Sequence, residues 1–397
     1  MWRCYLADTM SGQLAEPIDI PSFTWAAAIS DSSMATTRDK GAGTYEASGL
    51  ELPWTAVPGS DAPARQRALA PYRRSVVLMW EDEAGRTPVV VGAIGPRLDG
   101  WLDTSFELVS MANLLGQRIV VPEGAYGKGS PAGTTTQDLA YRGMSLRAIA
   151  SAIGQRATGD KPGGSLPIDW GYAGEAGSHQ RTYYGYNAQN NGFSKLLDAM
   201  TNVIGGPDAQ LRPYLADETH VRHRLEMGTD ASPELDQTGL VRTLTSFPGG
   251  GTLEDVRVAH TAPVMRIYAH GAGQDKGQLG YLAEDLTLVR QRDPWPLIEE
   301  AASFSDDATL DLLRRHAQAR LAACSRPLAQ VTGSIWLDDP ATPSITEIWP
   351  GQIVSIDIEG HPGLPDGAYD MRLMEMKGDQ SSKVEVTFDP IIDPWEA

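Results

Sequence analysis

Few residues in this sequence have the type and spacing that metal binding requires. His220 and His223 are separated by two positions. A helical zinc pair is separated by three, and a metalloprotease also places a glutamate between its histidines. Metal binding is therefore not expected. Segment 271–277, GAGQDKG, has the glycine content of a phosphate-binding loop, but no Gly-Lys-Ser/Thr follows. A hairpin loop is the preferred interpretation of that segment.

Candidate nucleophiles and paired carboxylates are equally sparse. The GMSLR sequence at 143–147 lacks the second glycine of a hydrolase nucleophile elbow. The acidic pairs at 338–339 and 299–300 are adjacent in sequence, so spacing alone does not make them the facing carboxylates of a glycosidase. We therefore expect no catalytic residues, no cofactor-binding residues and no metal ligands. The sequence predicts a protein that is not an enzyme.

Two features are of a kind that could bind a partner. Four arginines form a local basic cluster, either a solvated face or a docking site for an acidic partner: Arg65, Arg67, Arg73 and Arg74. Segment 159–192 is rich in tyrosine and could stack the bases of a single strand. It contains only Lys161 and Arg181 as cations, too few to follow a phosphate backbone. Packing or subunit contact is therefore the favoured interpretation of that segment.

The negative charge is concentrated near the C-terminus. The net charge is −18, and residues 333–397 hold 13 acidic against 3 basic residues, a local net charge of −10. Such a surface repels nucleic acid. It could serve solubility, or it could form a wall that DNA passes without adhering. Composition does not separate these two possibilities.

Length and composition predict a multidomain, folded chain. The 397 residues exceed one ordinary core, and 41% are hydrophobic. Two distant cysteines, Cys4 and Cys324, exclude a disulfide framework and a cysteine-based zinc module. We expect neither a membrane span nor a signal peptide, and hence synthesis in a cytoplasm.

The first hundred residues predict β structure. Two strand-forming runs at 75–80 and 88–94 flank a polar loop, which is typical of a hairpin. Alternation at 104–111 predicts another strand, followed by a short helical turn. Segment 34–71 is rich in Gly, Pro and Ala, and a structureless loop of that length is uncommon. We expect it to be partly strand or to form an arm that packs on another subunit.

Three helices are predicted in the middle of the chain. Ser145 can cap the first, whose buried stripe starts at Leu146. Ser194 can cap the second, whose apolar face runs from Leu196 to Ile204. The third fits residues 306–324, with acids at its start and arginines further on. Its expected buried stripe consists of Leu310, Leu313, Ala317, Leu321 and Cys324.

The final 65 residues alternate in the manner of antiparallel strands. One side of the runs at 352–359 and 383–389 is apolar and expected to be buried: Val354, Ile356, Ile358, Val384, Val386 and Phe388. The other side carries carboxylates that could face a channel: Asp357, Glu359, Glu385 and Asp389. The fold class predicted overall is α+β, with two small antiparallel β-barrel-like domains framing a mixed α/β region.

Three segments together resemble the tail-hub proteins of siphophages, particularly phages of actinobacteria. The first runs from SFTWAAAIS through VVLMWED and PVVVGAIG to FELVSMANLLGQR. The second is the helical DATLDLLRRHAQARLAA. The third extends from GSIWLDDPATPSITEIWPGQIVSIDIEG to KVEVTFDP. The resemblance covers most of the chain and depends on element order and a few residues, without a catalytic signature.

This resemblance implies a structural hub at a virion tail tip, assembled in the host cytoplasm. Three copies, each with two barrels, would form a ring between a six-fold tube or distal tail protein and a three-fold spike or fibre. The other expected partners are the tape measure protein and, in transit only, genomic DNA. The chain stops at Ala397, after the β region. We therefore expect wall-hydrolase and receptor-binding extensions to lie on other chains.

Two other functions remain open at this point. A carbohydrate-binding receptor module at the tail tip fits the ten tryptophans and the aromatic segment. A cell-wall hydrolase is the other alternative, but the sequence shows no set of residues that could serve as its nucleophile or metal ligands. The expected domains are an N-terminal β hub domain (1–120), an α/β domain with the Gly/Tyr-rich segment (121–240), an α/β domain with strands and a long helix (241–330), and an acidic C-terminal β hub domain (331–397).

Overall fold

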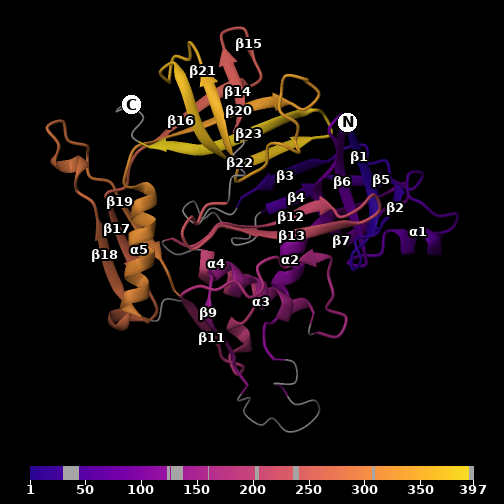
Figure 1. The fold of residues 1–397 in the computed structure, drawn as a ribbon, viewed down its shortest axis with the longest axis horizontal. Coiled ribbons are helices and arrows are strands. Elements are labelled where there is room, and N and C mark those ends of the chain that lie inside the picture. Colours follow the sequence, from indigo (N-terminus) through magenta and orange to yellow (C-terminus); the bar gives the residue numbers. More distant parts are fainter. Residues whose placement is uncertain are drawn as a thin grey trace.

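The computed structural model describes residues 1–29, 44–122, 126, 137–159, 161–201, 205–235, 241–305 and 309–392. The protein is α+β and mostly β, with two large curled sheets and two smaller modules that project from them (Figure 1). The predicted succession of β, mixed α/β and β along the chain is confirmed. No helix among the described residues is long and apolar enough to cross a membrane.

The N-terminal sheet has six strands in the order β2-β1-β6-β7-β8-β5. Its strands are β1 (Trp2–Asp8), β2 (Leu14–Pro17), β5 (Leu50–Pro53), β6 (Arg74–Asp82), β7 (Gly85–Asp99) and β8 (Asp103–Ser110). β6 and β7 form the predicted hairpin. The short helix α1 (Ala62–Ala68) follows β5, and Asp61 caps it by accepting a hydrogen bond from the Ala64 backbone N–H at 2.7 Å.

The C-terminal sheet has nine strands and draws on both ends of the chain. Its main path is β15-β14-β21-β22-β23-β20-β16, and β22 also pairs with β3, which pairs with β4. The strands are β3 (Thr24–Ala28), β4 (Thr44–Ser48), β14 (Arg242–Phe247), β15 (Gly250–Gly251), β16 (Glu254–Thr261), β20 (Leu328–Trp336), β21 (Ile353–Ile358), β22 (Gly367–Asp379) and β23 (Lys383–Ile392). The predicted strand content of segment 34–71 is confirmed by β4 and β5, while residues 34–43 lie outside the described residues.

One hydrophobic core joins the two sheets. It includes Leu6 and Leu78 of the N-terminal sheet together with Ile356 and Val386 of the C-terminal sheet. All six residues predicted to form the apolar side of the last strands are buried, which confirms that expectation: Val354, Ile356, Ile358, Val384, Val386 and Phe388. The two sheets therefore pack directly on each other, and the mixed α/β parts lie outside them rather than between them.

The middle module follows β8 and has its own core. It holds three helices, α2 (Met111–Gly116), α3 (Leu146–Thr158) and α4 (Phe193–Thr201), and the 3-10 turn η1 (Ala188–Asn190). Its strands are β9 (Leu139–Met144), β10 (Ile168–Asp169), β11 (His179–Tyr183), β12 (Ala209–Leu215) and β13 (Val221–Met227). Ser145 caps α3 as predicted, accepting from the Ala148 N–H at 3.1 Å.

A second module is inserted between two neighbouring strands of the C-terminal sheet. β16 and β20 are antiparallel neighbours, and the last residue of β16, Thr261, is paired with the first residue of β20, Leu328. Between them lie β17 (Arg266–His270), β18 (Gly280–Glu284), β19 (Glu299–Ser303), α5 (Leu310–Cys324) and the turns η2 (Asp275–Gly277) and η3 (Leu288–Arg290). This module has a separate small core. It projects away from the rest of the protein (Figure 1).

Two helix predictions require correction. Helix α4 begins at Phe193, so Ser194 lies inside it and is not its cap. Helix α5 begins at Leu310 behind the cap Thr309, and Leu310 is exposed. The buried stripe of α5 is therefore shorter than predicted. It begins one turn later and consists of Leu313, Ala317 and Leu321. The predicted residues Val203, Ile204, Asp306 and Asp307 lie outside the described residues.

The predicted domain boundaries are crossed by strand pairing. β14 pairs in parallel with β21, although they fall in the third and fourth predicted domains. β3 of the first predicted domain pairs with β22 of the last. The domain boundaries remain predictions. The C-terminal sheet nevertheless combines strands from three of the four predicted domains.

Candidate functional site

The two histidines weighed as metal ligands are directed to different surroundings. His223 is 2% exposed on β13, and burial lowers the pKa of its imidazole to about 4. Its ring forms a hydrogen bond to the backbone of Val91 on β7. The His220 Nδ1 lies 3.0 Å from an Asp217 carboxylate oxygen on the surface. Within the described ranges, no group of three or more His, Cys, Asp or Glu side chains is arranged to hold a metal.

The two loop motifs have structural roles. Segment 271–277 lies within the antiparallel connection of β17 and β18, which confirms the hairpin interpretation. Ser145 is buried, and its hydroxyl oxygen is engaged as the α3 cap. The sequence motif around it therefore serves helix initiation.

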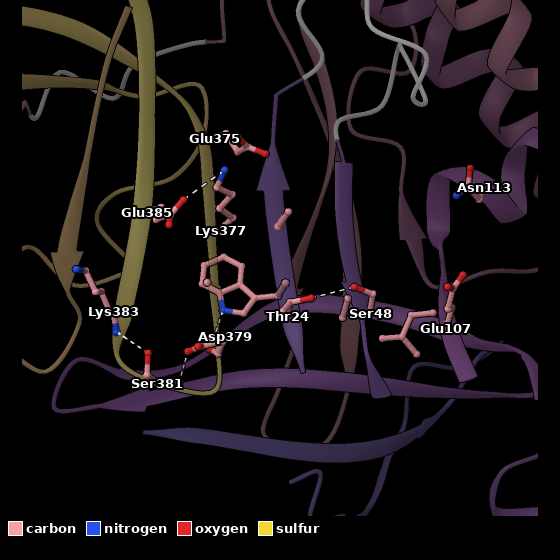
Figure 2. A pocket seen from close by; sticks show the side chains of 15 residues that line it. Thr24, Ser48, Glu107, Asn113, Glu375, Lys377, Asp379, Ser381, Lys383 and Glu385 are labelled. Carbon is pink, nitrogen blue, oxygen red and sulfur yellow. Dashed lines mark hydrogen bonds and ion pairs between the residues drawn. The ribbon is translucent and has the colours of Figure 1, made fainter. Parts of the chain in front are cut away.

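Among the described residues, one concave surface is an open groove of about 840 Å³. Figure 2 shows it crossing from the C-terminal sheet to the N-terminal sheet. Its apolar wall consists of Ala26 and Leu108 together with two largely buried residues, Trp25 and Ala47. Its polar lining comes from β3, β4, β8, β22, β23 and the connecting turn: Thr24, Ser48, Glu107, Glu375, Lys377, Asp379, Ser381, Lys383 and Glu385. We call this surface the sheet groove.

The sheet groove is acidic on balance. Four carboxylates line it, those of Glu107, Glu375, Asp379 and Glu385, against two lysines. One lysine, Lys377, lies 3.3 Å from Glu385. The other, Lys383, pairs at 2.7 Å with Asp255 outside the lining. Both lysine charges are therefore partly neutralised by neighbouring carboxylates. The remaining negative charge makes the groove suited to a cationic or polar partner that carries some apolar surface.

The predicted acidic set is not gathered in one patch. Asp357 faces Ala368 near the start of β22, whereas Glu385 faces Lys377 near its end. These β22 positions are nine residues apart, about 30 Å in an extended strand. Glu359 is exposed just beyond β21.

Asp389 differs from the other three carboxylates in its surroundings. Burial raises the pKa of its carboxyl group, opposed by a hydrogen bond at 2.6 Å from the Arg372 backbone N–H. The side chain is only partly exposed. Asp389 therefore has a local structural role in addition to any charge that it contributes to the surface.

The predicted basic cluster lies on and just after α1. Arg67 and Arg73 are exposed, while Arg65 is partly buried. Arg74 begins β6 and lies 3.7 Å from Asp8. Two arginines are thus fully available at the surface of this part of the N-terminal sheet.

The tyrosine-rich segment divides into a packed part and an exposed part. Trp170, Tyr172 and Tyr183 pack against the core of the middle module, as favoured from the sequence. Tyr184 and Tyr186 are exposed and stack on each other with ring centroids 5.5 Å apart. The aromatic content alone did not distinguish these two groups.

Sequence reasoning did not identify the sheet groove. Its apolar wall residue Trp25 is hydrogen-bonded through Nε1 to the backbone of Asp379, 354 positions away. Nothing in the sequence around Trp25 indicates that its strand, β3, pairs with β22. Pairing of β3 with β22 is what assembles this surface.

No protein-family model matches the sequence, and no curated protein matches it. Among solved structures, the chain is similar to a tail protein from Neisseria meningitidis MC58 (13% identity, TM-score 0.47, covering 98% of this chain and 96% of that one). It is also similar to the 43 kDa tail protein of prophage MuSo2 from Shewanella oneidensis (12%, 0.49, 97% and 98%). A third is an E. coli component of the type VI secretion system (11%, 0.46, 98% and 77%). Similarities of this size support no conclusion about what this chain does.

Proposed function

We propose that this chain is a structural hub subunit of a phage tail tip. The observation that carries the proposal is the pair of large sheets, built from both ends of the chain and joined by one core. A chain of this kind presents two β units in a fixed relation. That is what a hub needs in order to offer two docking surfaces per subunit. The resemblance in sequence supports the same role, whereas the solved structures are too distant to carry it.

In this proposal three copies form a ring. Each copy contributes two β units, so the three copies together present six positions to a six-fold tail tube or distal tail protein. Towards a spike or fibre the ring keeps its three-fold symmetry. The tape measure protein would contact the ring during assembly, and DNA would pass through its lumen. The modules that project from the sheets are available for contacts with neighbouring chains.

The proposed role is not enzymatic. The residues that could do chemistry are engaged in structure: Ser145 caps a helix, and His223 is buried with a hydrogen bond to a neighbouring strand. Catalysis requires a nucleophile, a base and an orienting group that converge on one accessible point. In the sheet groove, Lys377 is paired with Glu385 and Lys383 with Asp255 outside the lining.

Imaging of the purified chain and of assembled tails by cryo-electron microscopy tests the hub proposal. The expected result is a closed three-fold ring with an open lumen. A single copy per particle, without a self-contact reaching the roughly 1,000 Å² of a specific interface, would refute it. Release of peptidoglycan fragments by the purified chain would refute the non-enzymatic part separately.

We further propose that the outward carboxylates line the lumen and keep DNA from adhering. Replacing Asp357, Glu359 and Glu385 with lysine should leave folding nearly intact, because the structure places all three at exposed positions. DNA ejection should slow at low salt and recover at high salt, since each phosphate that is neutralised adds a salt-dependent increment of binding. A matched control reverses three exposed acids elsewhere: Glu16, Glu83 and Asp293. Equal slowing in both variants would assign the carboxylates to solubility.

The stacked tyrosines favour carbohydrate binding as a second candidate function. Tyr184 and Tyr186 are exposed, and the Tyr126 hydroxyl donates to the Gly185 carbonyl between them at 2.7 Å. Aromatic faces of this kind suit the apolar faces of sugars. A glycan array with the intact chain tests this function, with Tyr184→Ala and Tyr186→Ala as variants. Signal that these variants abolish would favour a receptor-binding role over a hub.

A further inference from the structure

Three arginines line a hollow of about 340 Å³ at the junction of the middle module with the N-terminal sheet, where β12 lies beside β7 (Figure 1). Arg86 comes from the start of β7, Arg212 from β12 and Arg224 from β13. The one carboxylate in the lining is that of Glu226, so three arginines against one glutamate give a local charge of +2 on a chain whose net charge is −18. We call this surface the arginine hollow.

Two of these arginines are placed directly opposite each other. The register of β12 and β13 pairs Arg212 with Arg224. Side chains opposite each other in an antiparallel pair point to the same face with their Cβ atoms about 5 Å apart, and like charges in that position are destabilising. On the other face of the two strands, Leu211 and Leu225 are buried in the core of the middle module. Both guanidinium groups therefore lie on the outer face, where their repulsion favours an anion between them.

The carboxylates near this pair neutralise it only in part. The Arg212 Nη1 lies 4.0 Å from a Glu226 carboxylate oxygen, the outer limit of an ion pair. Asp169 attracts Arg224 electrostatically, but its carboxylate is bonded to a different arginine, Arg222, at 2.6 Å. Positive charge therefore remains at the two facing arginines.

Aromatic rings fix the orientation of both guanidinium groups. That of Arg212 lies over the ring of Trp349 at 4.7 Å from its centroid, and that of Arg224 lies over the ring of Tyr214 at 4.5 Å. A guanidinium group carries five N–H donors at its edge, and stacking occupies its face. Stacked arginines of this kind are suited to bidentate hydrogen bonds with planar or tetrahedral oxyanions, and little side-chain entropy is left to lose on binding.

The third arginine is held at the side of the hollow. The Arg86 Nη2 donates a hydrogen bond to the Glu218 backbone carbonyl at 3.1 Å, in the connection between β12 and β13. This contact employs one of its five donors and does not neutralise its charge. Arg86 therefore adds a positive charge that comes from a different part of the fold.

We propose that the arginine hollow binds a small oxyanion, a phosphate or carboxylate group. Its oxygens accept hydrogen bonds from Arg212 and Arg224, and its negative charge offsets the repulsion between them. A hollow of about 340 Å³ admits such a group but not a nucleic-acid duplex, which the acidic charge of the whole chain also repels. The site lies within one chain, so it is independent of the proposed ring.

Isothermal titration calorimetry of the full chain tests the site with three probes. They are inorganic phosphate, citrate and a capped tri-glutamate peptide, each at an ionic strength matched with sodium chloride. Binding of phosphate would identify a phosphate group as the ligand chemistry. Binding of citrate or of the peptide without phosphate would identify carboxylates, free or on a polypeptide respectively. Absence of binding by all three probes would overturn the inference.

Removal of single arginines locates the binding. Arg224→Gln and Arg212→Gln should each weaken the binding of the same probe at least about 10-fold, because a charge-assisted hydrogen bond is lost. The matched control is Arg67→Gln, which removes another exposed arginine, on α1, and should leave the dissociation constant unchanged. An unchanged dissociation constant for Arg224→Gln would contradict the inference, as would an equal loss in the control.

Thermal unfolding distinguishes anion binding from a packing role of the arginines. A saturating probe should raise the Tm of the wild-type chain, because it binds the folded state alone, and the rise should be smaller for Arg224→Gln. If the arginines only pack on aromatic rings, the variants lower the Tm equally with and without the probe. Arg86 and Arg224 are exposed, so Arg86→Gln and Arg224→Gln still decide the matter if Arg212→Gln does not fold. The same rise in wild type and in both of these variants would overturn the inference.

Discussion

Acid should destabilise this protein through one buried histidine. His223 lies on β13 between the middle module and the N-terminal sheet, and its pKa of about 4 is well below the ordinary value of 6.5. The cause is burial, which penalises the charged imidazolium. Between these two pH values the unfolded chain binds a proton at His223 that the folded chain does not. The free energy of unfolding therefore falls as the pH drops from 6.5 to 4, and this contribution is fully present above 6.5.

The magnitude follows from the two pKa values. The loss attributable to His223 reaches about 2 kcal/mol at pH 5 and approaches about 3 kcal/mol near pH 4, at 1.36 kcal/mol per pKa unit. A loss of this size is a substantial part of the stability of an ordinary domain. It should appear as loosening of the middle module from the N-terminal sheet, since the His223 ring bonds to Val91 across that junction.

The assay is chemical denaturation of the wild-type chain and the His223→Gln variant from pH 7.5 to pH 4. Glutamine is neutral throughout, so the variant should lose less stability on acidification, and the difference between the two profiles should follow the values above. His220→Gln is the control, because that histidine is only partly buried, at the surface beside Asp217. Parallel profiles for wild type and His223→Gln would show that this histidine does not carry the effect.

Two further substitutions test the packing of the modules. A Cβ added at Gly154 of α3 would lie 2.3 Å from a ring carbon of Trp170, so Gly154→Ala should lower the free energy of unfolding by about 1–3 kcal/mol. Gly171→Ala is its matched control in the same denaturation assay, since a Cβ there meets no atom within 4 Å, and equal effects would contradict the argument. The ion pair of Asp208 and Arg372 joins the middle module to the C-terminal sheet, and Asp208→Ala should cost about 3–5 kcal/mol by removing the ion-pair partner of a largely buried guanidinium. Asp208→Ala combined with Arg372→Leu should recover much of that loss, and failure to recover would show that the charge is not the cause.

Local periodicity was sufficient for much of the secondary structure. The alternation at 352–359 and 383–389 predicted which side chains are buried, because a strand directs successive residues to opposite faces. The hairpin of β6 and β7 and the cap of α3 at Ser145 were likewise predicted from nearby residues. Each of these features depends on interactions within a few positions, so one sequence is enough to reveal it.

The tertiary structure alone decided which distant segments meet. β3 lies beside β22, and the resulting surface combines Trp25 with Glu375 and Glu107. Asp357 and Glu385 were grouped by their common alternation, but the register of β22 separates them. Strand order and register are set by long-range packing in the shared core, which leaves no periodic signal in the chain. Composition and local pattern thus determined the elements and their buried faces, whereas the sheet groove depends on how those elements assemble.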